Sequence, residues 1–146
     1  MRASLLSERG PAVTAVNFLE PVFIESFPAA MDSGALYISI PYRTCGHLCC
    51  CGCGQEVITP LSPTQWSFTY DGENVSLAPS VGNWALPCQS HYSIRHGKVR
   101  WNRRYTPGEI AENRKRDRQL LAQHADRDRA LPGLLGKVRG LVRWPR

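Results

Sequence analysis

The chain has 146 residues, of which 42% are hydrophobic, and this length allows one domain of ordinary size with an appendage. Residues 1–94 hold three Lys/Arg and seven Asp/Glu (net −4), whereas residues 95–146 hold fifteen Lys/Arg and five Asp/Glu (net +10). The basic part therefore has a separate role or meets an acidic partner. No apolar run is long enough to span a bilayer, which excludes a helical membrane protein. The first ten residues lack the apolar stretch of a signal peptide, so we expect a cytoplasmic protein in a reducing environment.

The first predicted element is a strand over Ala35–Ile40, preceded by the turn-forming Asp32-Ser33-Gly34. The strand leads directly into a cysteine cluster, since Cys45–Gly54 contains five of the six cysteines and one of the four histidines. Three consecutive cysteines disfavour a disulfide framework, because neighbouring side chains of an extended segment point to opposite faces. The cluster therefore predicts a metal site.

A second ligand pair, Cys88 and His91, follows the cluster at Cys-x2-His spacing. Two short ligand runs separated by a spacer are typical of zinc. The candidate ligands are Cys49, Cys51, Cys53, Cys88 and His91.

The choice among these ligands stays open at this level. Gly52 and Gly54 favour a knuckle-like turn with Cys51 and Cys53 as ligands, and Cys88 and His91 would complete a tetrahedral set. On an extended strand, His47, Cys49, Cys51 and Cys53 share one face and Cys50 lies on the other, so Cys50 and the outlying Cys45 are the expected spare thiols. If Cys51, Cys53, Cys88 and His91 form the tetrahedral set, His47 and Cys49 remain as competing ligands, neighbours of the ligands, or catalytic groups.

Two β-hairpins are predicted after the cluster. Aromatic and aliphatic residues alternate from Trp66 to Leu77 on either side of Asp71-Gly72, whose residue types favour a primed turn. A similar alternation runs from Tyr92 to Trp101 on either side of His96-Gly97. The Cys88/His91 pair stands at the entrance of this second hairpin.

A basic helix is predicted next. Thr106-Pro107-Gly108-Glu109 is a capping box with proline at the first helical position, and the helix should run to about Ala130. After Leu131-Pro132-Gly133, a short basic amphipathic segment follows. The fold class is α+β: a small, mainly antiparallel β zinc-binding domain of short hairpins, followed by a basic C-terminal helix. The expected boundaries are a flexible N-terminus over 1–12, the zinc-binding domain over 13–105 and a basic helical tail over 106–146.

Three residues near the ligands are catalytic candidates: Glu56, His47 and Ser90. Glu56 could act as general base for zinc-bound water, or it is a solvated residue on a turn or strand. Ser90, between two ligands, could be a nucleophile or substrate contact, or it hydrogen-bonds a ligand or the backbone. His-Glu-x-x-His does not occur, and the His-x-Glu half of the zinc deaminase signature is missing.

A longer set of motifs resembles a bacterial family known as a domain of unknown function. The motifs are His47-Leu48-Cys49-x-Cys51-Gly52-Cys53-Gly54, Val57-x-Thr59-Pro60-Leu61-Ser62-Pro63-Thr64-x-Trp66, Asp71-Gly72-Glu73, Val75-Ser76-Leu77-x-Pro79-Ser80-x-Gly82-Asn83-Trp84 and Pro87-Cys88-x-Ser90-His91-Tyr92. The resemblance covers roughly Phe18–Trp101. Members of this family are encoded beside ubiquitin-like proteins and homologues of ubiquitin-activating and ubiquitin-conjugating enzymes.

The resemblance implies a metal-dependent peptidase that matures a ubiquitin-like precursor or removes the ubiquitin-like protein from its targets. Zn²⁺ would be the cofactor, and the ubiquitin-like protein or its conjugates would be the partner. With this resemblance, Glu56 or His47 would be the proton shuttle. The alternative is a structural zinc module without catalysis, whose basic tail binds nucleic acid or a protein partner.

Overall fold

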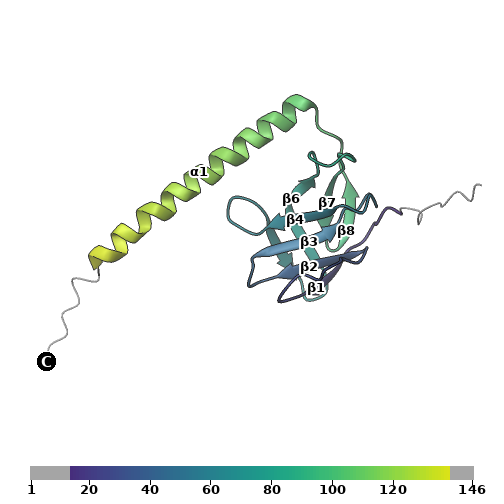
Figure 1. Cartoon of the computed structure of the whole chain (residues 1–146), viewed down its shortest axis with the longest axis horizontal. Helices are drawn as coiled ribbons and strands as arrows, with labels where there is room; N and C mark the ends of the chain where they lie inside the picture. Colours follow the sequence, from purple (N-terminus) through teal and green to yellow (C-terminus); the bar gives the residue numbers. More distant parts are fainter. Residues whose placement is uncertain (1–13, 139–146) are drawn as a thin grey trace, which may run out of the picture. The chain divides into compact units, whose positions relative to one another are not determined.

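A computed structural model of the chain describes the backbone of residues 14–138 and the side chains as far as Ala130. The fold class is α+β, with eight short strands and one C-terminal helix in this part of the chain (Figure 1). The elements are β1 (Glu20–Phe23), β2 (Ala35–Ser39), β3 (Thr44–Leu48), β4 (Glu56–Pro60), β5 (Ser67–Tyr70), β6 (Val75–Gly82), β7 (His91–Arg95), β8 (Lys98–Trp101) and α1 (Pro107–Val138). The expected flexible N-terminus at 1–12 lies outside the described residues.

The strands form two four-stranded sheets in sequence order, β1-β2-β3-β4 and β5-β6-β7-β8. All neighbours pair antiparallel except β1 and β2, which are parallel. Both predicted hairpins are present, as β5–β6 and β7–β8. In the second one, His96 and Gly97 take φ angles of 47° and 76°, as a two-residue type I′ turn requires at both central positions.

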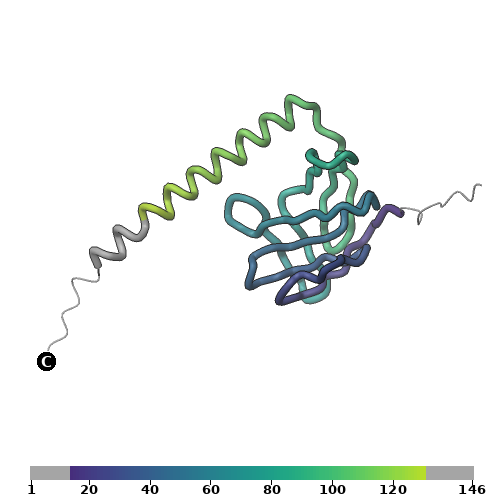
Figure 2. Tube along the Cα trace, viewed as in Figure 1, coloured from purple at the N-terminus to yellow at the C-terminus, as the bar shows by residue number. Residues whose placement is uncertain are grey.

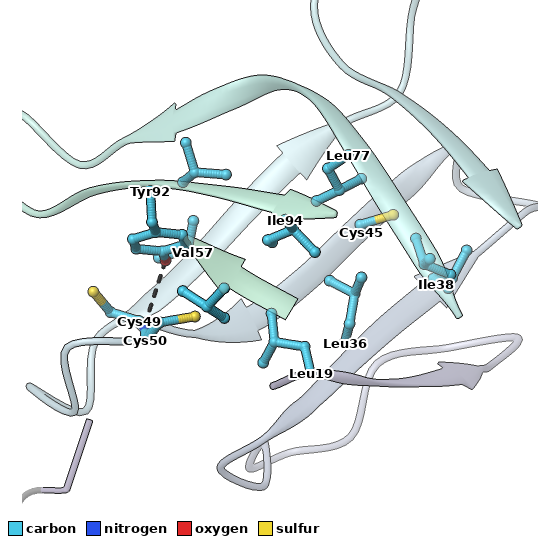
Figure 3. Close-up of a cluster of buried hydrophobic side chains, with 13 residues drawn as sticks. Leu19, Leu36, Ile38, Cys45, Cys49, Cys50, Val57, Leu77, Tyr92 and Ile94 are labelled. Carbon is cyan, nitrogen blue, oxygen red and sulfur yellow. Dashed lines mark hydrogen bonds between the residues drawn. The ribbon is translucent and has the colours of Figure 1, made fainter. Parts of the chain in front are cut away.

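The two sheets enclose one apolar core. Side chains of the first sheet, including Leu36, Ile38 and Val57, point toward Leu77, Tyr92 and Ile94 of the second (Figure 3). Cys45, Cys49 and Cys50 belong to the same cluster, so half of the cysteines are core residues. Residues just before β1 join the two sheets. The Leu19 N–H donates to Gly97 O, next to the edge strand β8, and the N–H of Val99, within β8, donates to Asn17 O.

The helix α1 has the predicted capping box. Thr106 N–H donates to Glu109 Oε2 (2.8 Å), and Glu109 N–H donates to Thr106 Oγ1 (3.3 Å). The helix does not end at about Ala130 but continues to Val138 (Figure 1). Figure 2 follows the Cα trace of the same helix in colour as far as Ala130. A proline inside a helix removes one backbone hydrogen bond and crowds the preceding turn, which costs about 3 kcal/mol, but α1 continues past Pro132.

Contacts divide the chain into two compact units. One contains all eight strands and ends at Arg104, and the other begins at Tyr105 and also takes in Pro63–Gln65. The remainder of the predicted amphipathic segment, beyond Val138, lies outside the described residues. Within those residues, no helix has the length and apolarity needed to cross a membrane.

Candidate active site and cysteine cluster

Four cysteines converge at one end of the β domain. Their sulfur atoms, from Cys49, Cys51, Cys53 and Cys88, all lie within 4.8 Å of one another. Cys49 immediately follows β3, and the chain then turns, because Gly52 N–H donates to Cys49 O (2.9 Å) and Cys49 N–H donates to Gln55 O (2.8 Å). Gly52 and Gly54 have φ angles of 84° and 79°, so the two glycines give the turn the backbone freedom that the sequence predicted.

The cluster fits a tetrahedral metal ion. Sulfurs about 2.3 Å from a zinc ion form a tetrahedron with edges of about 3.8 Å. Cys49 Sγ lies 3.8 Å from Cys88 Sγ and 3.4 Å from Cys51 Sγ, close to that spacing. Four thiolates also fill a tetrahedral shell, which is the ligand set of structural rather than catalytic zinc.

Three thiols of the cluster differ in the direction in which their pKa is shifted. Burial alone would raise the pKa of Cys88, but hydrogen bonds from Ser90 and the neighbouring thiols of Cys51 and Cys49 outweigh it, and the pKa falls to about 7. The pKa of Cys51 and that of Cys53 are raised, with burial as the largest cause in each.

Ser90 supports the cluster. Its Oγ lies 3.1 Å from Cys49 Sγ, 3.5 Å from Cys88 Sγ and 3.0 Å from Asn83 Nδ2. Ser90 is buried, and no histidine among the described residues contacts its hydroxyl. These contacts are those of the alternative in which Ser90 hydrogen-bonds a ligand, and its role as a nucleophile stays a prediction.

His47 lies in the core. It is fully buried, its Nε2 lies 2.8 Å from Tyr92 Oη, and burial lowers its pKa to about 4. Tyr92 Oη accepts from Asn83 Nδ2 (3.3 Å) and from the Cys50 N–H (3.4 Å), so its own proton is left for His47 Nε2. His47 therefore carries its proton on Nδ1, which has no partner in the described structure. This buried position does not suit a proton shuttle for a substrate.

The other expected site residues lie outside the four-cysteine cluster. Glu56 is the exposed first residue of β4 and is not part of the four-cysteine group. Cys45 and Cys50, expected to be the spare thiols, are fully buried outside that group, and burial raises the pKa of each to about 12.

His91 also lies outside the cysteine group and instead contacts Ser80. His91 Nε2 lies 2.9 Å from Ser80 Oγ, and His91 Nδ1 lies 2.7 Å from the carbonyl oxygen of Arg103. A carbonyl only accepts, so in the neutral imidazole Nδ1 carries the proton and Nε2 accepts from the Ser80 hydroxyl. This is the arrangement of a nucleophile with its general base, with a backbone carbonyl in the position that orients the base.

A bulge in β6 positions Ser80. Leu77 pairs with Ile94 and Val81 with Tyr92, so three residues of β6 oppose one residue of β7 at this point. The bulge contains Pro79, which has no N–H to give to a ladder. Because Gly82 pairs with His91, alternation places Ser80 on the same sheet face as His91, as its diagonal neighbour.

Trp84 packs beside the same imidazole. The rings of Trp84 and His91 are 5.1 Å apart at 57°. A Cβ atom added at Gly82 would lie 2.5 Å from Trp84 Nε1, so the absent side chain of Gly82 leaves the room in which the indole lies. Ser80 is half-buried and His91 is 5% exposed, which leaves the serine as the more accessible member of the pair.

Comparison with known proteins identifies the family to which the chain belongs. A family model described as "Bacterial ubiquitination-like system serine protease (BubE)" matches residues 23–102. The chain belongs to this family. No curated protein and no solved structure matches. The resemblance to a family of ubiquitin-like conjugation systems is thus confirmed, and the BubE description names serine rather than metal-dependent catalysis.

Sequence reasoning missed Ser80. Both Ser80 and His91 stand in the motifs that carry the BubE resemblance, but no cysteine or histidine lies next to Ser80 in the sequence to mark it as part of a site. The available signal was Pro79 inside an alternating strand pattern, which indicates a bulge and hence a side chain displaced from the regular ladder.

Proposed function

We propose that this chain is a serine peptidase that cleaves the peptide or isopeptide bond at the C-terminus of a ubiquitin-like protein, with Ser80 as nucleophile and His91 as general base. The 2.9 Å contact between Ser80 Oγ and His91 Nε2 carries the proposal. The BubE family supplies the reaction class and the ubiquitin-like partner.

The reaction would proceed in two steps. Ser80 Oγ attacks the scissile carbonyl while His91 Nε2 takes the hydroxyl proton, and His91 then gives that proton to the departing amine, leaving an ester on Ser80. Water loses a proton to His91 and attacks the ester, and the proton returns to Ser80 Oγ as the acid is released. The Arg103 carbonyl stabilises the imidazolium through its contact with Nδ1.

We propose zinc as the metal of the cysteine cluster, held by Cys49, Cys51, Cys53 and Cys88. The donor set and its spacing support it. Bound zinc would cross-link the turn after β3 to the loop before β7 and so supply folding free energy. Hydrolysis needs no vacant metal position in this proposal, because Ser80 and His91 provide the nucleophile and the base.

The test compares two serines of one sheet face. Ser80→Ala and Ser93→Ala are each assayed for cleavage of a ubiquitin-like protein carrying a C-terminal extension, and for labelling by a fluorophosphonate. Ser80→Ala should lower kcat by roughly 1000-fold or more and abolish labelling. Ser93→Ala removes a hydroxyl whose only partner among the described residues is Asn102 Nδ2, which donates to it, so this variant should keep both activities. Cleavage retained by Ser80→Ala contradicts the proposal.

The alternative function, a non-enzymatic zinc module with a nucleic-acid-binding tail, gains little from the charges of α1. The helix holds seven Lys/Arg and five Asp/Glu, a net charge of only +2. Five further cations of the basic half precede the helix, between Arg95 and Arg104, and belong to the β domain.

A further inference from the structure

The charges of the β domain are separated in sequence. Between residues 74 and 108 there are five Lys/Arg and no Asp/Glu, whereas between residues 14 and 73 there is one Arg and six Asp/Glu. The five cations are Arg95, Lys98, Arg100, Arg103 and Arg104. Ser80 and His91 both fall within the basic segment, so the two proposed catalytic residues come from a part of the chain without a carboxylate.

The sheet register brings three of these cations to one face. Arg95 pairs with Lys98 and Ser93 pairs with Arg100, and alternation along β7 places this set on the same face as His91. The opposite face is the buried one, since Tyr92, Ile94 and Val99 belong to the core. The outward face of β7 and β8 therefore carries a row of three cations, which we call the basic face: Arg95, Lys98 and Arg100.

The basic face is exposed and uncompensated. All three side chains are exposed, and none forms an ion pair within the described part of the chain. The carboxylate of Asp71, in the β5–β6 turn, contacts His96 Nδ1 at 3.0 Å instead. Arg95 follows His91 by four positions of β7, or about 13 Å at the usual strand rise. This separation exceeds the Debye length of about 8 Å at physiological salt but not the length of about 30 Å at 0.01 M, so the cations should act on a substrate near His91 most strongly at low salt.

From these observations we infer that the basic face is the docking surface for an acidic segment of the substrate polypeptide, which it holds while the scissile bond lies at Ser80. This inference rests on the proposed peptidase function and adds the charge of the substrate. Complementary charges beside an active site raise the rate of encounter, and the effect is lost as salt rises. A nucleic acid would also be attracted, but amide hydrolysis at the adjacent pair requires a polypeptide.

The test neutralises the basic face. Arg95→Gln/Lys98→Gln/Arg100→Gln is compared with Arg114→Gln/Lys115→Gln/Arg116→Gln, which makes the same change of charge on exposed residues of α1. Cleavage of the ubiquitin-like precursor is measured at about 0.02 M and about 0.3 M salt. The β-sheet variant should lose roughly 10- to 100-fold in kcat/KM at low salt, through KM, and much less at high salt. The helix variant should keep the wild-type salt dependence.

Two further measurements separate the possible failures. A small neutral fluorophosphonate reacts at Ser80 without reaching the basic face, so absence of labelling in the wild-type chain refutes the peptidase proposal itself. If the wild type is labelled and cleaves the precursor but the β-sheet variant has an unchanged KM, the docking inference is wrong. Poly-L-glutamate should inhibit the wild type competitively; inhibition by a DNA oligonucleotide, with no effect of poly-L-glutamate, would also overturn the inference.

Discussion

Only two residues separate Cys88 from His91 in the sequence, yet their side chains belong to different sites. Cys88 Sγ lies 3.8 Å from Cys49 Sγ, and His91 Nε2 lies 2.9 Å from Ser80 Oγ. Between them, Ser90 contacts both Cys49 and Cys88. The cysteine cluster therefore holds the start of the same short segment that presents the proposed base.

The first prediction concerns the ligand set. His91→Gln should retain one zinc ion with four sulfur ligands, because both ring nitrogens of His91 are engaged by Ser80 and Arg103. Cys88→Ala should lose most of its zinc, since it removes one of the four thiols. Zinc-edge X-ray absorption and metal analysis check both. Cys50→Ala is the control, because it removes a cysteine from the core without touching the cluster. A nitrogen ligand to zinc that is present in the wild type and absent in His91→Gln would show that His91 is a ligand, as the sequence predicted.

The second prediction concerns metal removal. Chelation should lower both the melting temperature and the peptidase activity, although no cluster cysteine acts on the substrate in our proposal. The reason is that the metal binds only the folded cluster, and the cluster anchors the segment that ends at His91. Activity and thermal unfolding are followed during titration with a chelator and again after zinc is restored. Full activity in a zinc-free, folded chain would show that the cysteine cluster does not position the Ser80–His91 pair.

The third prediction is a pH dependence of stability. The pKa of the buried His47 is lowered to about 4 from the ordinary 6.5. Between these values the unfolded chain binds a proton that the folded chain does not, so the free energy of unfolding decreases as pH falls through this window, by up to about 3 kcal/mol.

Chemical denaturation from pH 7 to pH 4 measures this loss. His47→Gln keeps an acceptor for the Tyr92 hydroxyl but does not titrate, so the loss within the window should shrink by most of that amount. The exposed Asp71, whose pKa is lowered to about 2 chiefly by its hydrogen bond with the Asn74 N–H, affects stability mainly below the window. Equal pH profiles of the variant and the wild type would show that His47 is not the titrating group.

The fourth prediction concerns Trp84. In Gly82→Ala the new Cβ would lie 2.5 Å from the indole, so the ring must move away from its position beside His91. Catalysis should fall by about 10- to 100-fold, because small displacements of a catalytic group are costly. Gly108→Ala, whose nearest neighbour is Thr106 Oγ1 at 4.0 Å, is the matched control. The fluorescence spectrum of the tryptophans and the cleavage rate are compared; an altered spectrum with an unaltered rate would mean that the indole does not position the imidazole.

Much of the fold is predictable from local pattern. Both hairpins, the strand from Ala35 and the capping box at Thr106 arise from alternation and turn residues that act over a few positions. The cysteine cluster is also visible as a metal site. Of the two patterns left open for the cluster, the turn around Gly52 and Gly54 is the one that follows β3, and strand alternation ends at Leu48. His47, which alternation placed on the ligand face, is buried in the core.

The Ser80–His91 pair is not predictable from spacing. It depends on the register between β6 and β7 and on the bulge between Leu77 and Val81, and both are tertiary features. Cys88 and His91 matched a ligand spacing in sequence, but Gln89, with a φ of 45°, lies between them where the chain bends. Their side chains consequently reach different partners.

The last prediction tests the division into a β domain and a helical tail, which we propose to lie near residue 105. All thirteen members of the buried core cluster lie between Leu19 and Val99, and α1 is largely exposed along its described side chains. Deleting residues 106–146 should therefore leave a folded, zinc-binding β domain, with a free energy of unfolding within about 1 kcal/mol of that of the whole chain. Zinc content and chemical denaturation of the truncated chain measure this. Thr106→Ala in the whole chain is the complementary variant, because it removes the capping contact with Glu109 and should cost the helix about 1 kcal/mol without changing the core. A truncated chain that binds zinc poorly or unfolds without cooperativity would place part of the domain's stability in the tail.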